Sequence, residues 1–293
     1  MVSKRVLDAL RRAHDAGYLL SIASGRPLCM VNRSILKSGV MDFALCSNGA
    51  SVISLHDGTC LVSQNLSKRD ALDCYDLLRE FRPAWNVFFG GRAYFEWKGA
   101  SYMLTGRTGA VARTSRYTAA GGGMVRHLLR TMWRGMRYVA RMFSRGTMRQ
   151  VVSIKPQLLK AAEGVEKMGC SILDADACAR AAERLRADGR FEVVRMGRTE
   201  LEVTAHGVSK GTGAQALLDR LGIAPDRAVA FGDGGNDLPL AAAVGRFVAV
   251  GNADDEVKEA AFEVCPAVDQ DGVAVWIENM LAAGGLREGV RYV

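Results

Sequence analysis

The sequence predicts an α/β fold, a doubly wound parallel sheet interrupted by a separate α/β domain. Two observations support this prediction. Short apolar runs alternate with helical segments at both ends of the chain, and the stretches between them are short. The middle of the chain is richer in aromatic residues and in basic charge. We therefore expect a core domain in two parts, 1–82 and 195–293, with a cap domain inserted at 83–194.

The first part of the core alternates helix and strand. "RVLDALRRAHDAGY" has helical periodicity and stops at Gly17, "YLLSIAS" is a short strand, and Pro27 is placed to open another helix. "MDFALCSNGA" is a second strand that runs into a turn. "SVISLHDGTCLVSQNL" predicts a hairpin around Asp57-Gly58, because this dipeptide suits a tight turn.

The middle region has a different pattern. "WNVFFGGRAYFEW", "QVVSIK" and "FEVVR" predict strands, and "DACARAAERLRAD" predicts a helix. A longer amphipathic helix is expected from Met124 to about Arg145, after three glycines. Its arginines recur at spacings of three and four: Arg126, Arg130, Arg134, Arg137, Arg141 and Arg145.

The last part returns to the α/β alternation. Strands are expected at "TELEVTA", "AVAFGD" and "RFVAVG". Helices are expected at "SKGTGAQALLDRLG", "NDLPLAAAVG" and "DDEVKEAA", the last with acidic residues at its start, where the helix dipole favours them.

Composition excludes several classes of protein. The chain has 293 residues, of which 49% are hydrophobic, enough for a substantial core. No apolar run is long enough for a membrane span, and the N-terminus is charged where a signal peptide would be apolar, so we expect a cytoplasmic protein. The seven cysteines are odd in number and never spaced as CxxC, which argues against a disulfide framework and a zinc site.

The net charge of +8 is unevenly distributed. Residues 97–162 contain 13 Lys and Arg and no Asp or Glu, so the remainder of the chain carries −5. Such a basic insert suggests an anionic partner. The arginine-faced helix has three interpretations: a solvated outer face, peripheral contact with an anionic membrane, or a lining of the substrate entrance. We expect no nucleic-acid partner.

The stretch "AVAFGDGGNDLPL" predicts one side of a metal site. An apolar strand delivers Asp233 and Asp237 into a loop, and carboxylate oxygens at the end of a strand suit Mg²⁺. Gly234 and Gly235 permit a tight backbone path. The alternative is an Asp-Gly surface turn in which Asn236 caps the next helix.

These motifs resemble a known family. "VTAHGVSKGTGAQALLDRLGI", "AVAFGDGGNDLPLAAAVGRFVAVGNADDEVKEAA" and "DGVAVWI" are similar in order and spacing to the Cof-type branch of the haloacid dehalogenase (HAD) superfamily, and so are "LLSIASGRP" and "ALCSNGASV". The likeness covers both outer regions. It implies a HAD-like doubly wound (Rossmann-like) parallel sheet with an inserted α/β cap domain, and Mg²⁺-dependent phosphatase activity.

The resemblance also implies roles for single residues. Lys210 would be the fixed cation beside the transferring phosphoryl group, and Ser24 the hydroxyl that hydrogen-bonds a phosphoryl oxygen. Without the resemblance, Lys210 could be a surface lysine and Ser24 a helix cap. The remaining candidates are substrate-side or loop-shaping residues: Asn236, Asn48, Gly25 and Arg26.

One part of the family's site has no counterpart in this sequence. The family's reaction needs an aspartate nucleophile in a DxDGT loop on a first strand, which in relatives precedes the helix "SKRVLDALRRAHDAGY". Asp57-Gly58-Thr59 has matching letters, but Leu55 stands at the nucleophile's position and the segment lies in the expected hairpin. We expect that this strand is missing, through a reading frame that starts at an internal methionine or in a non-catalytic protein. Turnover by the chain as printed should then be near background.

We therefore predict a Mg²⁺-dependent phosphatase of small phosphorylated metabolites such as sugar phosphates, acting through an aspartyl-phosphate intermediate. The alternative is a non-catalytic protein of the same fold that binds phosphorylated ligands, or anionic lipid, through its basic cap.

Overall fold

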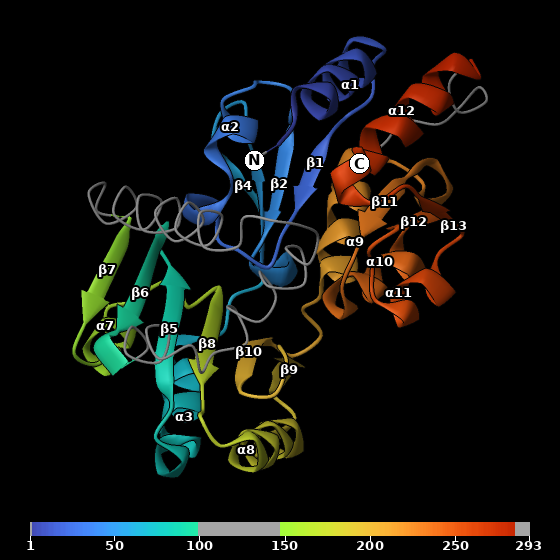
Figure 1. Cartoon of the computed structure of the whole chain (residues 1–293). Helices are drawn as coiled ribbons and strands as arrows, with labels where there is room; N and C mark the ends of the chain where they lie inside the picture. The colour runs from blue at the N-terminus through green and yellow to red at the C-terminus, as the bar shows by residue number, and fades with distance from the viewer. Residues whose placement is uncertain (1, 99–146, 285–293) are drawn as a thin grey trace, which may run out of the picture. The chain divides into compact units, whose positions relative to one another are not determined.

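The structure is a computed structural model that describes residues 2–98 and 147–284. The chain forms two compact units (Figure 1). Unit 1 joins Met1–Gln64 to Gly207–Val293, and unit 2 is Asn65–His206. Segments 65–82 and 195–206, which we expected in the core, belong to unit 2, because they supply a helix and a central strand to its sheet. The arginine-faced helix expected from Met124 to Arg145 lies outside the described residues.

The first sheet of unit 1 has the order β1-β2-β3-β4. β1 runs parallel to β2, whereas β3 is antiparallel to both of its neighbours, β2 and β4. The hairpin predicted around Asp57-Gly58 is confirmed as β3 and β4. The strands are β1 (Ser21–Ala23), β2 (Phe43–Cys46), β3 (Ser51–Ser54) and β4 (Cys60–Ser63).

The second sheet of unit 1 is parallel throughout and has the order β11-β12-β13. Its apolar strands are covered by helices, which is the α/β arrangement that the sequence predicts. The elements are β11 (Val229–Gly232), α10 (Leu238–Ala243), β12 (Arg246–Val250), α11 (Asp255–Ala260), β13 (Glu263–Cys265) and α12 (Gly272–Ala282).

One apolar core connects the two sheets. Leu217 of α9 (Lys210–Leu221) lies in the same buried cluster as Leu45 of β2 and Phe247 of β12. A second cluster packs α1 (Lys4–Asp15) against α12 through Ala13 and Ile277 (Figure 1). Helices on both sides therefore hold the sheets in one unit.

The facing sheets end in strands with one partner each. Within residues 2–98 and 147–284, β1 pairs with β2 alone and β11 pairs with β12 alone. A strand edge without a partner carries unpaired N–H and C=O groups. The expected absence of a central strand stays a prediction.

Pro27 opens only a short 3₁₀ helix, not the longer helix that an α/β alternation predicts. Pro27 is followed by a single 3₁₀ turn, Leu28–Met30, and Val31 is again extended. The helix α2 (Arg33–Leu36) begins only after Asn32, whose side chain accepts a hydrogen bond from the Ser34 backbone N–H. Asn32 caps α2, so this helix begins at Arg33 and not at Pro27, where the sequence predicted its start.

In its described residues, 65–98 and 147–206, unit 2 is a six-stranded sheet against which α3, α7 and α8 pack. The strand order is β7-β6-β5-β8-β10-β9, in which only the β6-β7 pair is parallel. Asp174 caps α8, because its side chain accepts hydrogen bonds from the backbone N–H groups of Asp176 and Ala177. The elements are α3 (Lys68–Leu77), β5 (Ala84–Phe89), β6 (Arg92–Glu96), β7 (Met148–Val151), α7 (Lys155–Leu158), β8 (Lys167–Ser171), α8 (Ala175–Asp188), β9 (Phe191–Arg195) and β10 (Glu200–Ala205).

In the described part of the chain, no helix combines the length and the hydropathy that a membrane span requires.

Gly49 lies in close backbone contact with Ser209, so its replacement should be costly. Gly49 has a φ of 98°, and a Cβ there would lie 2.1 Å from the backbone oxygen of Ser209. Gly49→Ala should lower the free energy of unfolding by about 2–5 kcal/mol, the sum of left-handed strain and overpacking. Gly58→Ala is the control, because Gly58 has a φ of 76° but open space around it. Equal urea unfolding midpoints for the two variants would contradict the close contact between Gly49 and Ser209.

Asp57 should make stability depend on acid pH. The backbone N–H of Thr59, and next the Ser54 hydroxyl, lower the pKa of Asp57 to about 2. A lowered folded-state pKa gives stability above the unfolded value of about 3.9, and this stability is lost as the pH falls through the folded pKa. The stability advantage of the wild type over Asp57→Asn should therefore shrink between about pH 4 and pH 2. Thermal unfolding midpoints measured across this range test it.

Candidate active site

The N-terminus of α9 positions the candidate lysine. Ser209 caps the helix, since its side chain accepts from the Thr212 backbone N–H while Thr212 Oγ1 accepts from the Ser209 N–H. Lys210 is therefore the first residue of a well-defined helix, and only 6% of it is exposed. Gly49 lies directly against Ser209, so the loop after β2 approaches the same helix end.

Lys210 forms a buried ion pair with Asp237. The distance from Lys210 Nζ to Asp237 Oδ1 is 2.5 Å, and the two side chains are 7% and 5% exposed. The other oxygen, Asp237 Oδ2, accepts hydrogen bonds from the backbone N–H groups of Asp233 at 2.9 Å and Gly234 at 3.2 Å. Asp237 thus uses both oxygens to hold the loop after β11 in place and to orient the lysine.

Asp233 has a different environment. It follows the last residue of β11 and is exposed, whereas Asp237 is buried. The surrounding protein reduces hydration of the carboxylate even though its surface is open, and this raises its pKa; the negative charge of Asp237 raises it further. Of the two aspartates, Asp233 is the one that solvent, and therefore a new ligand, can reach.

Asp233 and Asp237 carry carboxylates, which are a type of ligand that Mg²⁺ uses in proteins. Magnesium sites commonly use one or two protein carboxylates and take their other oxygens from water and a substrate phosphate. Within residues 2–98 and 147–284, no three His, Cys, Asp or Glu side chains come together as a metal-binding group. The donor set therefore fits a cation that shares its ligands with a phosphorylated substrate.

The Ser24 loop and the Asn48 loop lie side by side. Ser24 Oγ accepts from the Arg26 backbone N–H at 3.1 Å, so the hydroxyl proton remains available to another acceptor. The Asn48 N–H donates to the Ser24 carbonyl at 3.2 Å, and the Ser47 N–H donates to the Arg26 carbonyl at 3.0 Å. The loops after β1 and β2 are therefore connected through their backbones.

Asn236 connects these loops with the aspartate loop. Its Nδ2 donates to Asn48 Oδ1 at 3.2 Å, although the residues are 188 positions apart. Gly25 lies against the pair, since a Cβ there would be 2.7 Å from Asn48 Oδ1 and 3.5 Å from Asn236 Nδ2. Arg26 is exposed, and its guanidinium forms no hydrogen bond or ion pair with another described residue.

The structure thus connects all the sequence-predicted site residues except the Arg26 side chain. The close approach of Gly49 to Ser209 and to Gly213 was not predicted from the sequence. Gly213 was the available signal: it lies inside the helix α9, where glycine costs about 1 kcal/mol relative to alanine and therefore indicates a packing requirement. Sequence analysis also missed Ser47, whose φ of 52° is unusual for a non-glycine residue.

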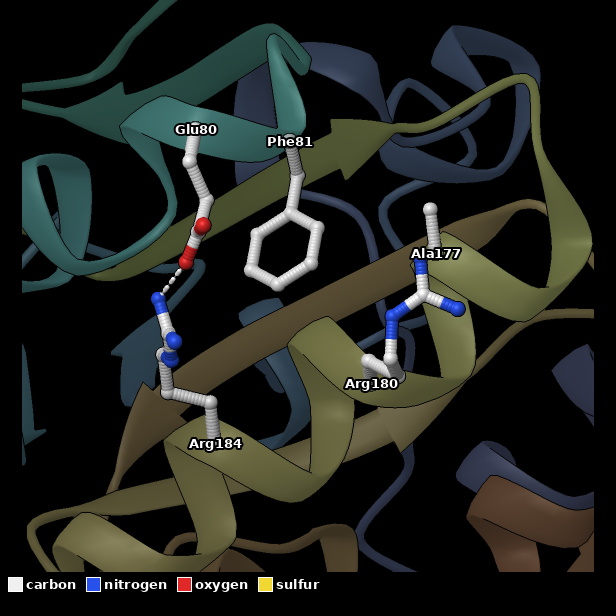
Figure 2. Close-up of a pocket in the computed structure, with 5 residues that line it drawn as sticks. All are labelled: Glu80, Phe81, Ala177, Arg180 and Arg184. Atoms are coloured by element: carbon white, nitrogen blue, oxygen red, sulfur yellow. Dashed lines mark hydrogen bonds and ion pairs between the residues drawn. The ribbon is translucent and has the colours of Figure 1, made fainter.

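A cavity of about 380 Å³ in unit 2 contains none of these residues. Figure 2 shows it between Phe81, which follows α3, and Arg180 of α8. Arg184 pairs with Glu80 across it and lies over the Phe81 ring, so its charge is already compensated. We assign no catalytic role to this cavity.

The family model of haloacid dehalogenase-like hydrolases matches residues 1–277. The chain belongs to this family. The resemblance deduced from the sequence motifs is confirmed, and so is the HAD-like α/β fold.

Similar HAD proteins are phosphatases. The chain is 24% identical over 283 residues to the 5-amino-6-(5-phospho-D-ribitylamino)uracil phosphatase YwtE of Bacillus subtilis, covering 96% of this chain and 93% of that one. A phosphoglycolate phosphatase of Methanopyrus kandleri is 41% identical over 102 residues, which is 35% of this chain and 44% of that protein.

Solved HAD structures share the fold. A haloacid dehalogenase-like hydrolase from B. subtilis matches with a TM-score of 0.77 and 21% identity, over 96% of this chain and 94% of that one. The HAD subclass IIB sugar phosphatase BT4131 matches with a TM-score of 0.67 and 19% identity, over 96% and 92%.

Removal of the lysine charge should destabilise the protein. In Lys210→Met, Asp237 would remain buried without its cation, so the free energy of unfolding should fall by about 3–5 kcal/mol. Lys258→Met is the control, because Lys258 pairs at 3.7 Å with Asp255, whose side chain is 98% exposed, and such a pair contributes at most about 1 kcal/mol. Similar losses in the two variants, measured by urea unfolding, would argue against a buried pair.

Proposed function

We propose that this protein is a Mg²⁺-dependent phosphatase of small phosphorylated metabolites such as sugar phosphates. The observation that carries the proposal is the buried Lys210–Asp237 pair, whose aspartate accepts a hydrogen bond from the backbone of the exposed Asp233. A positive group and an oxygen ligand at one strand end suit a phosphate monoester with its cation. Membership of the HAD family supports the same reaction class.

Each residue has a defined task in this proposal. Asp233 holds Mg²⁺, which supplies positive charge to the phosphoryl oxygens when bound. Lys210 is oriented by Asp237, and its ammonium stabilises negative charge on the phosphoryl group. Ser24 donates its hydroxyl proton to a phosphoryl oxygen, because its Oγ already accepts from the Arg26 N–H.

The substrate class follows from the names of relatives. YwtE is named for a phosphorylated ribityl compound, and BT4131 is described as a sugar phosphatase. Both names describe small polyhydroxylated phosphate esters. We extend this class to the present protein, whose basic segment at 97–162 is compatible with anionic substrates.

The proposed reaction also needs an attacking carboxylate. Asp57 does not provide it, because it lies in the turn at the far end of β3 from the Asn48 loop and binds the Thr59 N–H. We propose that the aspartyl-phosphate intermediate of this reaction requires an additional strand ending in DxDGT. Without such a strand the chain should release phosphate at a rate near background.

A phosphate-release assay tests this function. The printed chain and a version extended by an apolar strand ending in Asp-x-Asp-Gly-Thr are incubated with a panel of sugar phosphates, with and without Mg²⁺. The extended chain should release phosphate, and Asp233→Asn or omission of Mg²⁺ should reduce the rate by at least about 100-fold, since a metal ion contributes several kcal/mol. Asp255→Asn, an exposed carboxylate at the start of α11, is the matched control.

The other outcomes are also informative. Release by the printed chain that Asp233→Asn abolishes would show that another group replaces the proposed nucleophile. Phosphate binding without release by either version would favour the non-catalytic alternative, which no comparison supports.

A further inference from the structure

The Asn48–Asn236 hydrogen bond joins two loops that have separate tasks in the proposed function. Asn236 lies in the loop between Asp233 and Asp237, where the cation is expected. Asn48 lies in the loop that is bonded to Ser24, where the phosphoryl oxygens are expected. Their side chains meet at 3.2 Å, with Nδ2 of Asn236 donating to Oδ1 of Asn48.

Asn48 is held in an unusual conformation at this contact. Its φ is 60° and its ψ is 29°, it is 4% exposed, and the preceding Ser47 also has a positive φ, 52°. Two consecutive non-glycine residues in the left-handed region are unfavourable unless the surroundings stabilise them. The backbone bonds from Ser47 and Asn48 to the Ser24 loop provide that stabilisation.

Gly25 completes the contact. A Cβ at position 25 would lie 2.7 Å from Asn48 Oδ1, closer than real Cβ contacts allow. The backbone at Gly25 has a negative φ, so space rather than conformation requires glycine there. The Ser24 loop therefore packs directly on the oxygen that receives the hydrogen bond from Asn236.

From this geometry we propose that Asn48 and Asn236 are positioning residues, which form an amide clamp between the Ser24 loop and the Asp233–Asp237 loop. The clamp sets the separation between the hydroxyl of Ser24 and the carboxylate of Asp233, so that one phosphate can contact both. Asn236 acts through Asn48, not through the substrate. The tasks that we assign to the two loops rest on the proposed function, whereas the clamp itself can be tested without it.

Hydrogen exchange tests the clamp in the absence of activity. Asn236→Ala should raise the exchange rates of the Ser47 and Asn48 amides several-fold, since these amides donate to the Ser24 loop. Gly25→Ala should have the same effect by displacing Asn48 Oδ1. Asn48→Asp keeps the acceptor and should preserve protection. Asn279→Ala, an exposed asparagine on α12, is the control. Unchanged exchange at residues 47 and 48 in both Asn236→Ala and Gly25→Ala would overturn the clamp.

A double-mutant cycle separates positioning from substrate contact. Affinity for inorganic phosphate in Mg²⁺ buffer is measured for Asn48→Gly, Asn236→Ala and the double variant; glycine is chosen because of the positive φ. If the two residues act through one shared bond, each single variant should lose about tenfold in phosphate affinity. The double variant should then also lose only about tenfold. Losses that multiply to about 100-fold would show two independent substrate contacts and would contradict the proposal. Wild type that binds no phosphate would count against the proposed function, and hydrogen exchange would still decide on the clamp.

Discussion

The buried ion pair between Lys210 and Asp237 is the interaction on which the rest of the site depends. Two charges removed almost entirely from water are favourable only when their geometry is close and their remaining bonding capacity is used. Asp237 meets this requirement with the ammonium on one oxygen and two backbone N–H groups on the other. The pair therefore links the start of α9 to the loop after β11.

Close backbone contacts make this geometry possible. The first turn of α9 lies between Gly49 on one side and Pro239 of α10 on the other. A Cβ on Gly211 would be 2.2 Å from the Pro239 carbonyl oxygen, so the two helices can approach only because position 211 lacks a side chain. Small residues at the helix start therefore bring Lys210 within reach of Asp237. Steric and electrostatic constraints act on the same few residues.

Sequence patterns predicted the elements with strong local signals and missed those that depend on distant residues. Helix α9 was predictable from its cap and its closing Gly222, and β11 from its apolar run. Strand β8 was not predicted, because Lys167 and Gly169 interrupt the apolar pattern and its pairing with β5 and β10 stabilises it instead. The Asn48–Asn236 bond was beyond sequence reasoning for a similar reason. Its two residues belong to loops that only the folded sheet brings together.

The division of the chain has a consequence for how the protein can change over generations. Every candidate residue, from Ser24 to Asp237, belongs to unit 1, and the chain enters and leaves unit 2 between Gln64 and Gly207. Unit 2, residues 65–206, contains none of these candidate residues, so a substitution at any of its 142 positions replaces no side chain of the candidate site. Nearly half of the gene can therefore vary without changing the chemical groups that the site is built from.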